Sequence, residues 1–238
     1  MSEHHDSSDG FDLRRVSTRW SQIENVHGFV LCYVEPIRTY LQRLLDYPDD
    51  VDEVLQRLLV RMLESGFGNV DPDRGRFRHY LIRSVRNEVV TWQRERTRRG
   101  AVSLESTNAL QSVEVTSSDR AFWNQEWRAN LIDRAWQALL TQEETQPACF
   151  FHSVLKLATD HPKDNSTKLA AAMTLQTRQA MSATAFRKQL SRARRAFAAQ
   201  IVGDVADTLE TGDSRSLRDE LKEVGLMPYV EDFIDHLG

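Results

Sequence analysis

Apolar residues recur every three or four positions through most of the chain, and this spacing predicts amphipathic helices. In the first half it predicts one helix over residues 29–45, with Pro36 as a local distortion, and a second from Pro48 to Gly66. A third helix is predicted over residues 76–98. Its apolar stripe is Phe77, Tyr80, Leu81, Val85, Val89 and Trp92. No segment shows the strict alternation that predicts a β-strand.

The second half of the chain continues the helical pattern. A block that begins near Arg120 carries one apolar stripe. The stripe consists of Trp123, Trp127, Leu131, Ala135 and Leu139. The segments "PACFFHSVLKLA", "STKLAAAM" and "MSATAFRKQLSRARRAFAAQIVGDV" predict further helices, the last two joined by a turn. The tail "SRSLRDELKEVGLMPYVEDFIDHL" predicts a short helical hairpin with Gly225 and Pro228 at its bend.

These elements predict an all-α protein with two small helical domains joined by a flexible linker, the second domain containing a helix-turn-helix. The Ser-, Thr- and Val-rich stretch after residue 100 is typical of a linker. The expected divisions are a disordered arm 1–16, a first domain 17–100, a linker 101–119, a second domain 120–205 and an acidic helical tail 206–238.

Composition excludes several classes of protein. A chain of 238 residues can bury a core without disulfides or structural metals. Cys32 and Cys149 form no metal-binding or redox spacing, so buried thiols in a reducing compartment are expected. The polar start is not a signal peptide, and no apolar run is long enough to span a membrane. A cytoplasmic protein without cofactor or metal is expected.

The net charge of −4 hides an uneven distribution of charge. Residues 74–100 carry nine arginines and no lysine, and residues 166–202 carry seven basic side chains and no acid. Residues 203–238 carry ten acids and three bases. Arginine outnumbers lysine 26 to 5. The guanidinium fork suits phosphates and guanine edges, although a codon-composition bias would also raise the arginine count.

Three interpretations compete for residues 74–100: a solvated helical face, a site for an acidic protein, or a nucleic-acid site. Nucleic acid is favoured because aromatic residues lie among the arginines. Tyr80 and Trp92 can stack on unpaired bases while the arginines contact phosphates.

The second basic segment follows a helix-turn-helix pattern, which other helical hairpins can mimic. Ser182 is a plausible N-cap, and Phe186, Leu190 and Phe197 are expected to face inward. The basic residues and one serine recur at steps of three and four on the opposite face. They are Arg187, Lys188, Ser191, Arg192 and Arg195.

Several segments resemble bacterial RNA polymerase sigma factors of the ECF (extracytoplasmic function) group, in particular the planctomycete type. "DDVDEVLQRLLVRML" is similar to the family's D-A-E-D-L-x-Q-x-x-F-x-x-x-L helix of region 2. "VDPDRGRFRHYLIRSVRNEVVTWQRERTRRG" is similar to its D-P-x-R-G-R-F-R-x-Y-L segment. "AFRKQLSRARRAFAAQIVGDVADTL" resembles the last helix of region 4, and "LRDELKEVGLMPY" resembles the subgroup's tail.

The resemblance implies a sigma factor that binds RNA polymerase core and directs promoter recognition, melting and transcription initiation. Residues 17–100 would be region 2 and residues 120–205 region 4. Core-binding residues would be Asp50, Asp52, Glu53 and Gln56. Contacts to the minus-ten element would be Arg76, Arg78, Tyr80, Arg83, Arg86, Asn87, Trp92 and Arg94. Residues 65–75 would capture a flipped base.

The resemblance places the exposed face of residues 187–195 in the minus-thirty-five major groove. Three departures from the family pattern stand out. Arg57 replaces an acid, Thr91 stands where many relatives carry Asp, and "MTLQTRQAMS" replaces the tight "L-G-x-S" turn. The sequence leaves open whether this turn bulges or the preceding helix is longer.

Other functions remain as alternatives. A stand-alone helix-turn-helix regulator explains residues 166–202 well and residues 49–100 poorly. An enzyme is disfavoured because no catalytic motif or metal-ligand spacing is found. An anti-sigma factor or other regulatory protein is a further partner considered, and no membrane partner is expected. The acidic tail could cap region 4, the favoured interpretation, or screen its basic helix.

Overall fold

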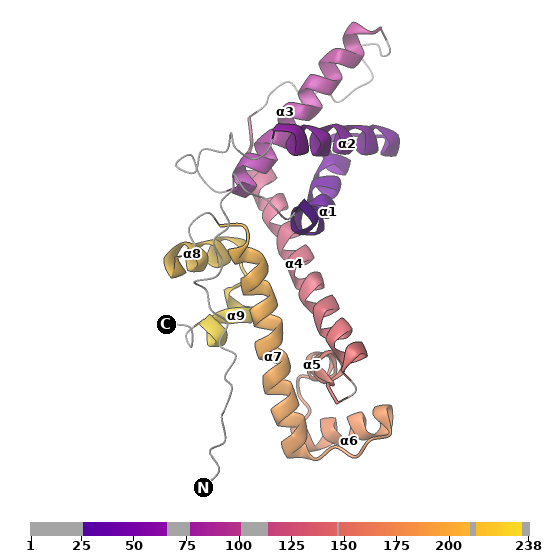
Figure 1. The fold of residues 1–238 in the computed structure, drawn as a ribbon, viewed down its shortest axis with the longest axis vertical. Helices are drawn as coiled ribbons and strands as arrows, with labels where there is room; N and C mark the ends of the chain where they lie inside the picture. The colour runs from indigo at the N-terminus through magenta and orange to yellow at the C-terminus, as the bar shows by residue number, and fades with distance from the viewer. Residues whose placement is uncertain (1–25, 66–76, 101–113, 147, 210–212, 235–238) are drawn as a thin grey trace.

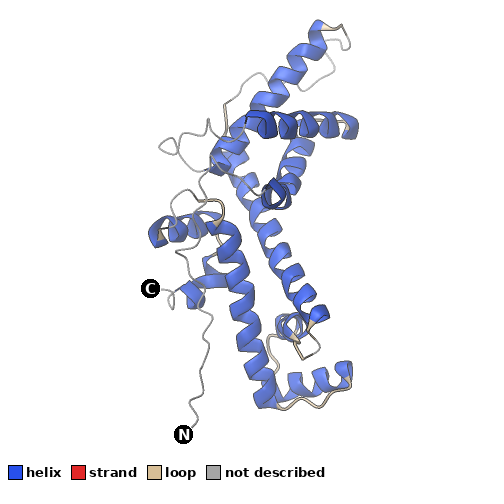
Figure 2. Cartoon of the chain, viewed as in Figure 1, coloured by secondary structure: helices blue, strands red, loops and turns tan. Residues whose placement is uncertain are grey.

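The computed structural model describes residues 26–65, 77–100, 114–146, 148–209 and 213–234 (Figure 1). Within these ranges the regular structure is entirely helical (Figure 2), so the predicted all-α fold class is confirmed. The helices are α1 (Val26–Leu44), α2 (Pro48–Ser65), α3 (Phe77–Arg98), α4 (Ser117–Thr145), α5 (Phe151–Asp160), α6 (Ser166–Thr177), α7 (Ala183–Ala206), α8 (Ser214–Val224) and α9 (Met227–Ile234).

Some predictions fall outside this part of the chain. They concern the arm 1–16, residues 66–75 of the base-capturing loop, Arg76, and residues 101–113 of the linker. Among the helices described here, none is both long and apolar enough to cross a membrane.

Short-range polar contacts define several helix ends. At the start of α4, the Thr116 side-chain oxygen accepts a hydrogen bond from the Asp119 backbone N–H at 3.1 Å, and the Asp119 carboxylate accepts one from the Thr116 N–H at 2.9 Å. This reciprocal pair is a capping box. Ser182, the predicted N-cap of α7, accepts from the Ala185 N–H at 3.1 Å. These caps satisfy backbone donors that a helix start leaves free.

Helix α4 is long, and it packs against α1 and α3 as well as against α5, α7 and α8 (Figure 1). Near its start, Trp123 lies edge-on to Tyr40 of α1 with ring centroids 5.8 Å apart, and Trp127 stacks on Tyr33 of α1 at 6.0 Å. Farther along, α4 packs against α7. All five residues of the predicted stripe are buried.

The main hydrophobic core is continuous across the predicted domain boundary. It joins buried residues of α1, α2, α3 and α4 with buried residues of α7, α8 and α9. The first turns of α4 therefore belong physically with α1–α3, although the sequence assigned residues 120–205 to a second domain. The division into two domains stays a prediction.

A smaller core lies where α5, α6 and α7 meet. It is formed by Val154, Leu169, Ala170, Met173 and Phe186. Helix α6 continues through Thr177 and ends at Arg178, whose φ of 56° is left-handed. The first residues of "MTLQTRQAMS" therefore belong to α6, and α7 starts after a short connection at Ala183.

The predicted tail hairpin is formed by α8 and α9. Gly225 ends α8 with a φ of 76°, a left-handed conformation that glycine adopts without a steric penalty. Apolar residues of both helices and of the turn between them enter the main core against α4 and α7. They are Leu217, Leu221, Val224, Leu226, Val230 and Ile234.

Candidate nucleic-acid and polymerase interface

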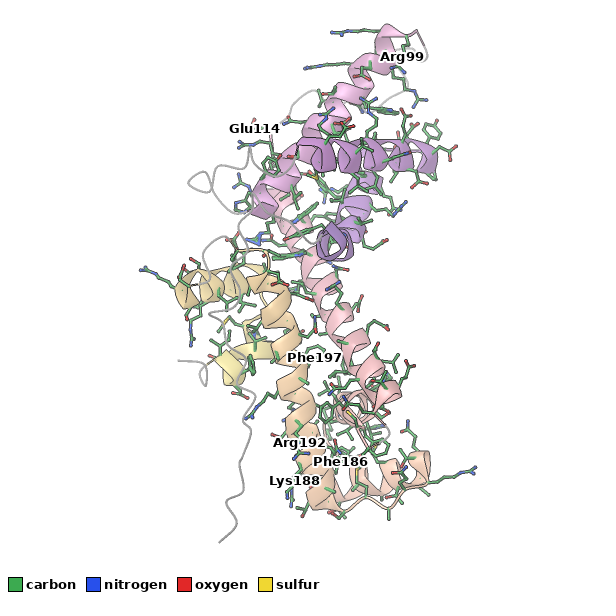
Figure 3. All side chains as sticks on the ribbon, in the orientation of Figure 1. Arg99, Glu114, Phe186, Lys188, Arg192 and Phe197 are labelled. Atoms are coloured by element: carbon green, nitrogen blue, oxygen red, sulfur yellow. The ribbon has the colours of Figure 1, made fainter. Side chains whose placement is uncertain are left out.

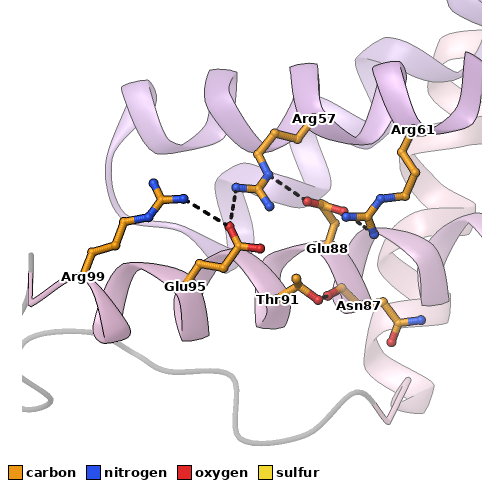
Figure 4. Close-up of polar contacts among 7 residues, drawn as sticks. All are labelled: Arg57, Arg61, Asn87, Glu88, Thr91, Glu95 and Arg99. Carbon is orange, nitrogen blue, oxygen red and sulfur yellow. Dashed lines mark hydrogen bonds and ion pairs between the residues drawn. The ribbon is translucent and has the colours of Figure 1, made fainter. Parts of the chain in front are cut away.

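Helix α3 presents a polar stripe, defined here as Tyr80, Arg83, Asn87, Thr91, Arg94 and Arg98. These residues follow one another at steps of three or four, so they share one side of the helix. Arg83, Asn87, Arg94 and Arg98 are exposed, while Tyr80 and Thr91 are half-buried. The Thr91 hydroxyl donates to the Asn87 backbone oxygen at 2.8 Å, and the Asn87 amide extends from the side of α3 away from α2 (Figure 4).

This stripe combines the groups that recognise single-stranded nucleic acid. Guanidinium groups can contact phosphates, an amide can pair with a base edge, and a tyrosine ring can stack on a base. Four residues of the stripe were predicted minus-ten contacts, namely Tyr80, Arg83, Asn87 and Arg94. Arg98 was not predicted as a contact, although its position four residues after Arg94 would have indicated it.

Three other predicted minus-ten contacts, Arg78, Arg86 and Trp92, are buried in the structure. A residue that contacts DNA was expected to be exposed. The side chain of Arg78 is 1% exposed and pairs with Glu220 at 3.0 Å and Glu223 at 2.6 Å. Trp92 is 3% exposed and belongs to the main core. Its position on the apolar stripe of α3 already indicated this burial.

Arg86 is the third of these buried residues, and it links three helices. Its guanidinium donates to Asp119 of α4 at 2.9 Å and to the Tyr40 hydroxyl of α1 at 3.3 Å. Burial alone would raise the pKa of Asp119, but hydrogen bonds from Thr116 and the Arg86 charge outweigh it and hold that pKa below its usual value. Burial raises the pKa of Tyr40 to about 12. Arg86 therefore fastens α3 to α1 and α4.

The predicted polymerase-binding residues lie along α2, at the surface of the molecule. Glu53 and Gln56 are exposed. Asp50 is half-buried and pairs with Arg96 of α3 at 2.6 Å, and Asp52 pairs with Arg38 of α1. The two aspartates are thus engaged within the chain, whereas Glu53 and Gln56 present their side chains to solvent.

An ion-pair network that was not predicted joins α2 to α3 (Figure 4). Arg57 pairs with Glu88 at 3.0 Å and with Glu95 at 2.9 Å, while Arg61 pairs with Glu88 at 2.7 Å and Arg99 lies 3.7 Å from Glu95. The Arg57 hydrogen bond is the main cause that lowers the pKa of Glu95. The arginine that replaces the family's acid therefore serves the contact between helices.

The basic face of α7 is exposed throughout. All five predicted minus-thirty-five contacts are exposed, and the opposite side carries Phe186 and Phe197, both buried. Figure 3 shows Lys188 and Arg192 on the side of α7 away from α5 and α6. Arg187 donates weakly to the hydroxyls of Ser166 at 3.4 Å and Thr184 at 3.3 Å. These hydroxyls orient its guanidinium at the start of α7.

An open groove of about 870 Å³ borders this basic face. Arg187, Ser191 and Arg195 of α7 line it together with Tyr229 and Asp232 of the α9 segment, over a floor of apolar residues from α4, α5 and α7. The tail hairpin thus lies next to the residues predicted to read the minus-thirty-five element.

Comparison with known proteins matches residues 29–99 to the family described as Sigma-70 region 2. The match spans most of α1 together with α2 and α3, and so includes the predicted polymerase-binding residues of α2 and the polar stripe of α3. No curated protein and no solved structure gives a significant match to the chain. Sigma factors are not enzymes, so this match agrees with the prediction of a non-enzymatic protein. Residues 29–99 are thus similar to Sigma-70 region 2, and this similarity indicates a sigma factor involved in RNA polymerase binding and promoter recognition.

Proposed function

We propose that this protein is a sigma factor of the ECF group, of the planctomycete type, which carries RNA polymerase core to promoters and opens them. One observation carries the proposal: the three arginines and Asn87 of the polar stripe are exposed inside the segment that matches region 2. A stand-alone helix-turn-helix regulator would have no use for this segment.

The polar stripe of α3 is proposed to hold the melted minus-ten element. Arg83, Arg94 and Arg98 would contact phosphates, and Tyr80 would stack on an unpaired base, an interaction worth about 1–3 kcal/mol. Asn87 would pair with an adenine edge or support the loop before α3. Arg86 and Trp92 would act indirectly, because they set the position of α3 against α1 and α4. Arg78 is paired with α8 in this structure.

Helix α2 is proposed to bind the polymerase core through its acidic face. Glu53 and Gln56 supply exposed contacts. Asp50 and Asp52 pair with arginines of the same chain, so they would contribute by exchanging those partners for basic residues of the polymerase. Such an exchange changes little in net ion-pair energy, because surface pairs are worth about 0–1 kcal/mol each.

Helix α7 is proposed as the reader of the minus-thirty-five element, with α6 crossing before it. Its exposed face contains Arg187, Lys188, Ser191, Arg192 and Arg195, and a major groove admits a helix of this kind. The buried side is held by Phe186 in the small core with α5 and α6. That packing gives the recognition face a fixed orientation.

The experiment that tests the proposal combines purified chain, RNA polymerase core and genomic DNA fragments from the source organism. We expect a stoichiometric complex in size-exclusion chromatography and discrete transcript starts when 5′ ends are sequenced. If the chain binds DNA but never associates with the core, a stand-alone regulator is the better assignment.

A double variant and a matched control test the polar stripe separately from core binding. Arg83→Ala with Arg94→Ala should leave core binding intact and reduce open-complex formation. Lys156→Ala with Lys163→Ala removes the same charge from exposed positions outside α3 and should leave both intact. Equal behaviour of the two double variants would contradict the assignment of the polar stripe.

A further inference from the structure

The start of α3 is held by the acidic hairpin, defined here as residues 214–234 of α8 and α9. Glu220 and Glu223 of α8 pair with Arg78, and the Glu223 carboxylate also lies 3.2 Å from His79 Nε2. His79 lies four residues before Arg83 of the polar stripe, so these two share a side of α3, whereas Arg78 lies on the buried side. An acidic segment near the end of the chain thus contacts the helix proposed to receive promoter DNA.

The carboxylates are aimed at α3 by the packing of α8. Leu217, Leu221 and Val224 are buried in the main core, which fixes the rotation of the helix. Glu220 shares this buried side and is 2% exposed, while the Glu223 side chain is 36% exposed at the edge of the contact. Arg78 also lies over the Trp127 ring of α4, with its guanidinium carbon 5.5 Å from the ring centroid.

The same hairpin reaches the second proposed DNA-binding helix. Tyr229, Asp232 and Phe233 line the groove beside the basic face of α7. Residues 214–234 carry five acids and three bases, so the hairpin is net negative. Its negative charge therefore lies beside both surfaces that need to attract phosphates.

We propose that the acidic hairpin is a built-in brake, which occupies Arg78 and His79 in place of nucleic-acid phosphates until α8 is displaced from α3. The inference rests on the proposed function of α3, and it deepens that function by naming its regulation. Carboxylates at this position act in two ways. They neutralise Arg78, and they repel phosphates that approach the start of α3.

Displacement of α8 frees the Arg78 guanidinium, whose charge is otherwise compensated by carboxylates of the same chain. In the held state Arg78 is compensated by two carboxylates although it is removed from water. In the released state a phosphate can replace them, so DNA and the acidic hairpin compete for one guanidinium. Competition of this kind predicts a measurable gain in DNA affinity when the carboxylates lose their charge.

The test compares full-length variants in binding to a fluorescein-labelled, mixed-sequence single-stranded 20-mer, followed by anisotropy at several salt concentrations. Glu220→Gln with Glu223→Gln removes the charge and keeps the shape of the two side chains. We expect about tenfold tighter binding at low salt. The slope of log K against log salt should steepen by about 0.7, which corresponds to one more phosphate contact.

The matched control is Asp219→Asn with Glu231→Gln, which removes the same charge from exposed positions of the same hairpin. Its affinity should rise less than threefold and its slope should stay that of the wild type. If both double variants gain equally, or neither gains, the brake is refuted.

A second variant keeps the test decisive if the glutamine pair fails to fold. Glu223→Lys changes only the half-exposed carboxylate, where a lysine can extend its ammonium group into water. It should bind the 20-mer more tightly than the wild type, with a helical circular dichroism spectrum. Wild-type affinity in a folded Glu223→Lys protein would overturn the inference.

Parallel transcription reactions with RNA polymerase core keep the two proposals apart. Tighter DNA binding by the charge variants without any directed transcription would retain the brake and reject the sigma-factor proposal. Normal transcription together with unchanged DNA affinity in every variant would retain the sigma-factor proposal and reject the brake.

Discussion

The buried pair between Arg86 and Asp119 is the sharpest place to test how α3 is held to α4. Asp119→Asn keeps the shape of the side chain and removes its charge, so the Arg86 guanidinium, at 6% exposure, loses the opposite charge of this pair. Breaking one side of a buried ion pair costs about 3–5 kcal/mol. We expect the lower end, about 3 kcal/mol, because Tyr40 still accepts a hydrogen bond.

The assay is thermal and urea unfolding followed by circular dichroism. For a protein of this size about 3 kcal/mol corresponds to a fall in Tm of roughly 6–12 °C. Asp133→Asn is the matched control, since it removes one exposed carboxylate from the same helix and should change the unfolding free energy by less than about 0.5 kcal/mol. If Asp119→Asn is no less stable than this control, the pair does not hold α3 to α4.

The pH dependence of stability gives an independent check on the same pair. The pKa of Asp119 is lowered in the folded protein, so the carboxylate's stabilising effect is complete above its ordinary pKa of 3.8 and is lost as the pH falls through the lower folded value. The wild type should therefore lose stability more steeply below about pH 4 than Asp119→Asn does. Parallel curves for the two proteins would contradict this assignment.

Three further predictions concern the proposed interfaces. Arg192→Ala should weaken binding to the minus-thirty-five duplex by about 1–3 kcal/mol if the arginine reads a guanine, whereas equal losses on permuted sequences would make it a phosphate contact. Tyr80→Ala should reduce open-complex formation more than duplex binding, and a normal permanganate footprint of the bubble would reject this role. Glu53→Arg should lower affinity for polymerase core in a pull-down titration while Glu144→Arg, at an exposed position of α4, should not.

Helical periodicity in the sequence determined much of this structure. Residues 76–98 were predicted as a helix, and α3 spans Phe77–Arg98. The division of α7 into a buried side with Phe186 and Phe197 and an exposed basic side was likewise predicted, and burial confirms it. Such features are local, because the period of 3.6 residues fixes which side chains share a face before any other helix packs.

Only the tertiary structure decided which charged residues face solvent. Arg78 and Arg83 look alike in sequence, but Arg78 meets carboxylates more than 140 residues away and is buried, whereas Arg83 is exposed. The continuity of the core through α4 is also a tertiary result. Ion pairs and shared cores depend on which distant helices become neighbours, and the hydrophobic pattern of a single helix carries no information about its partners.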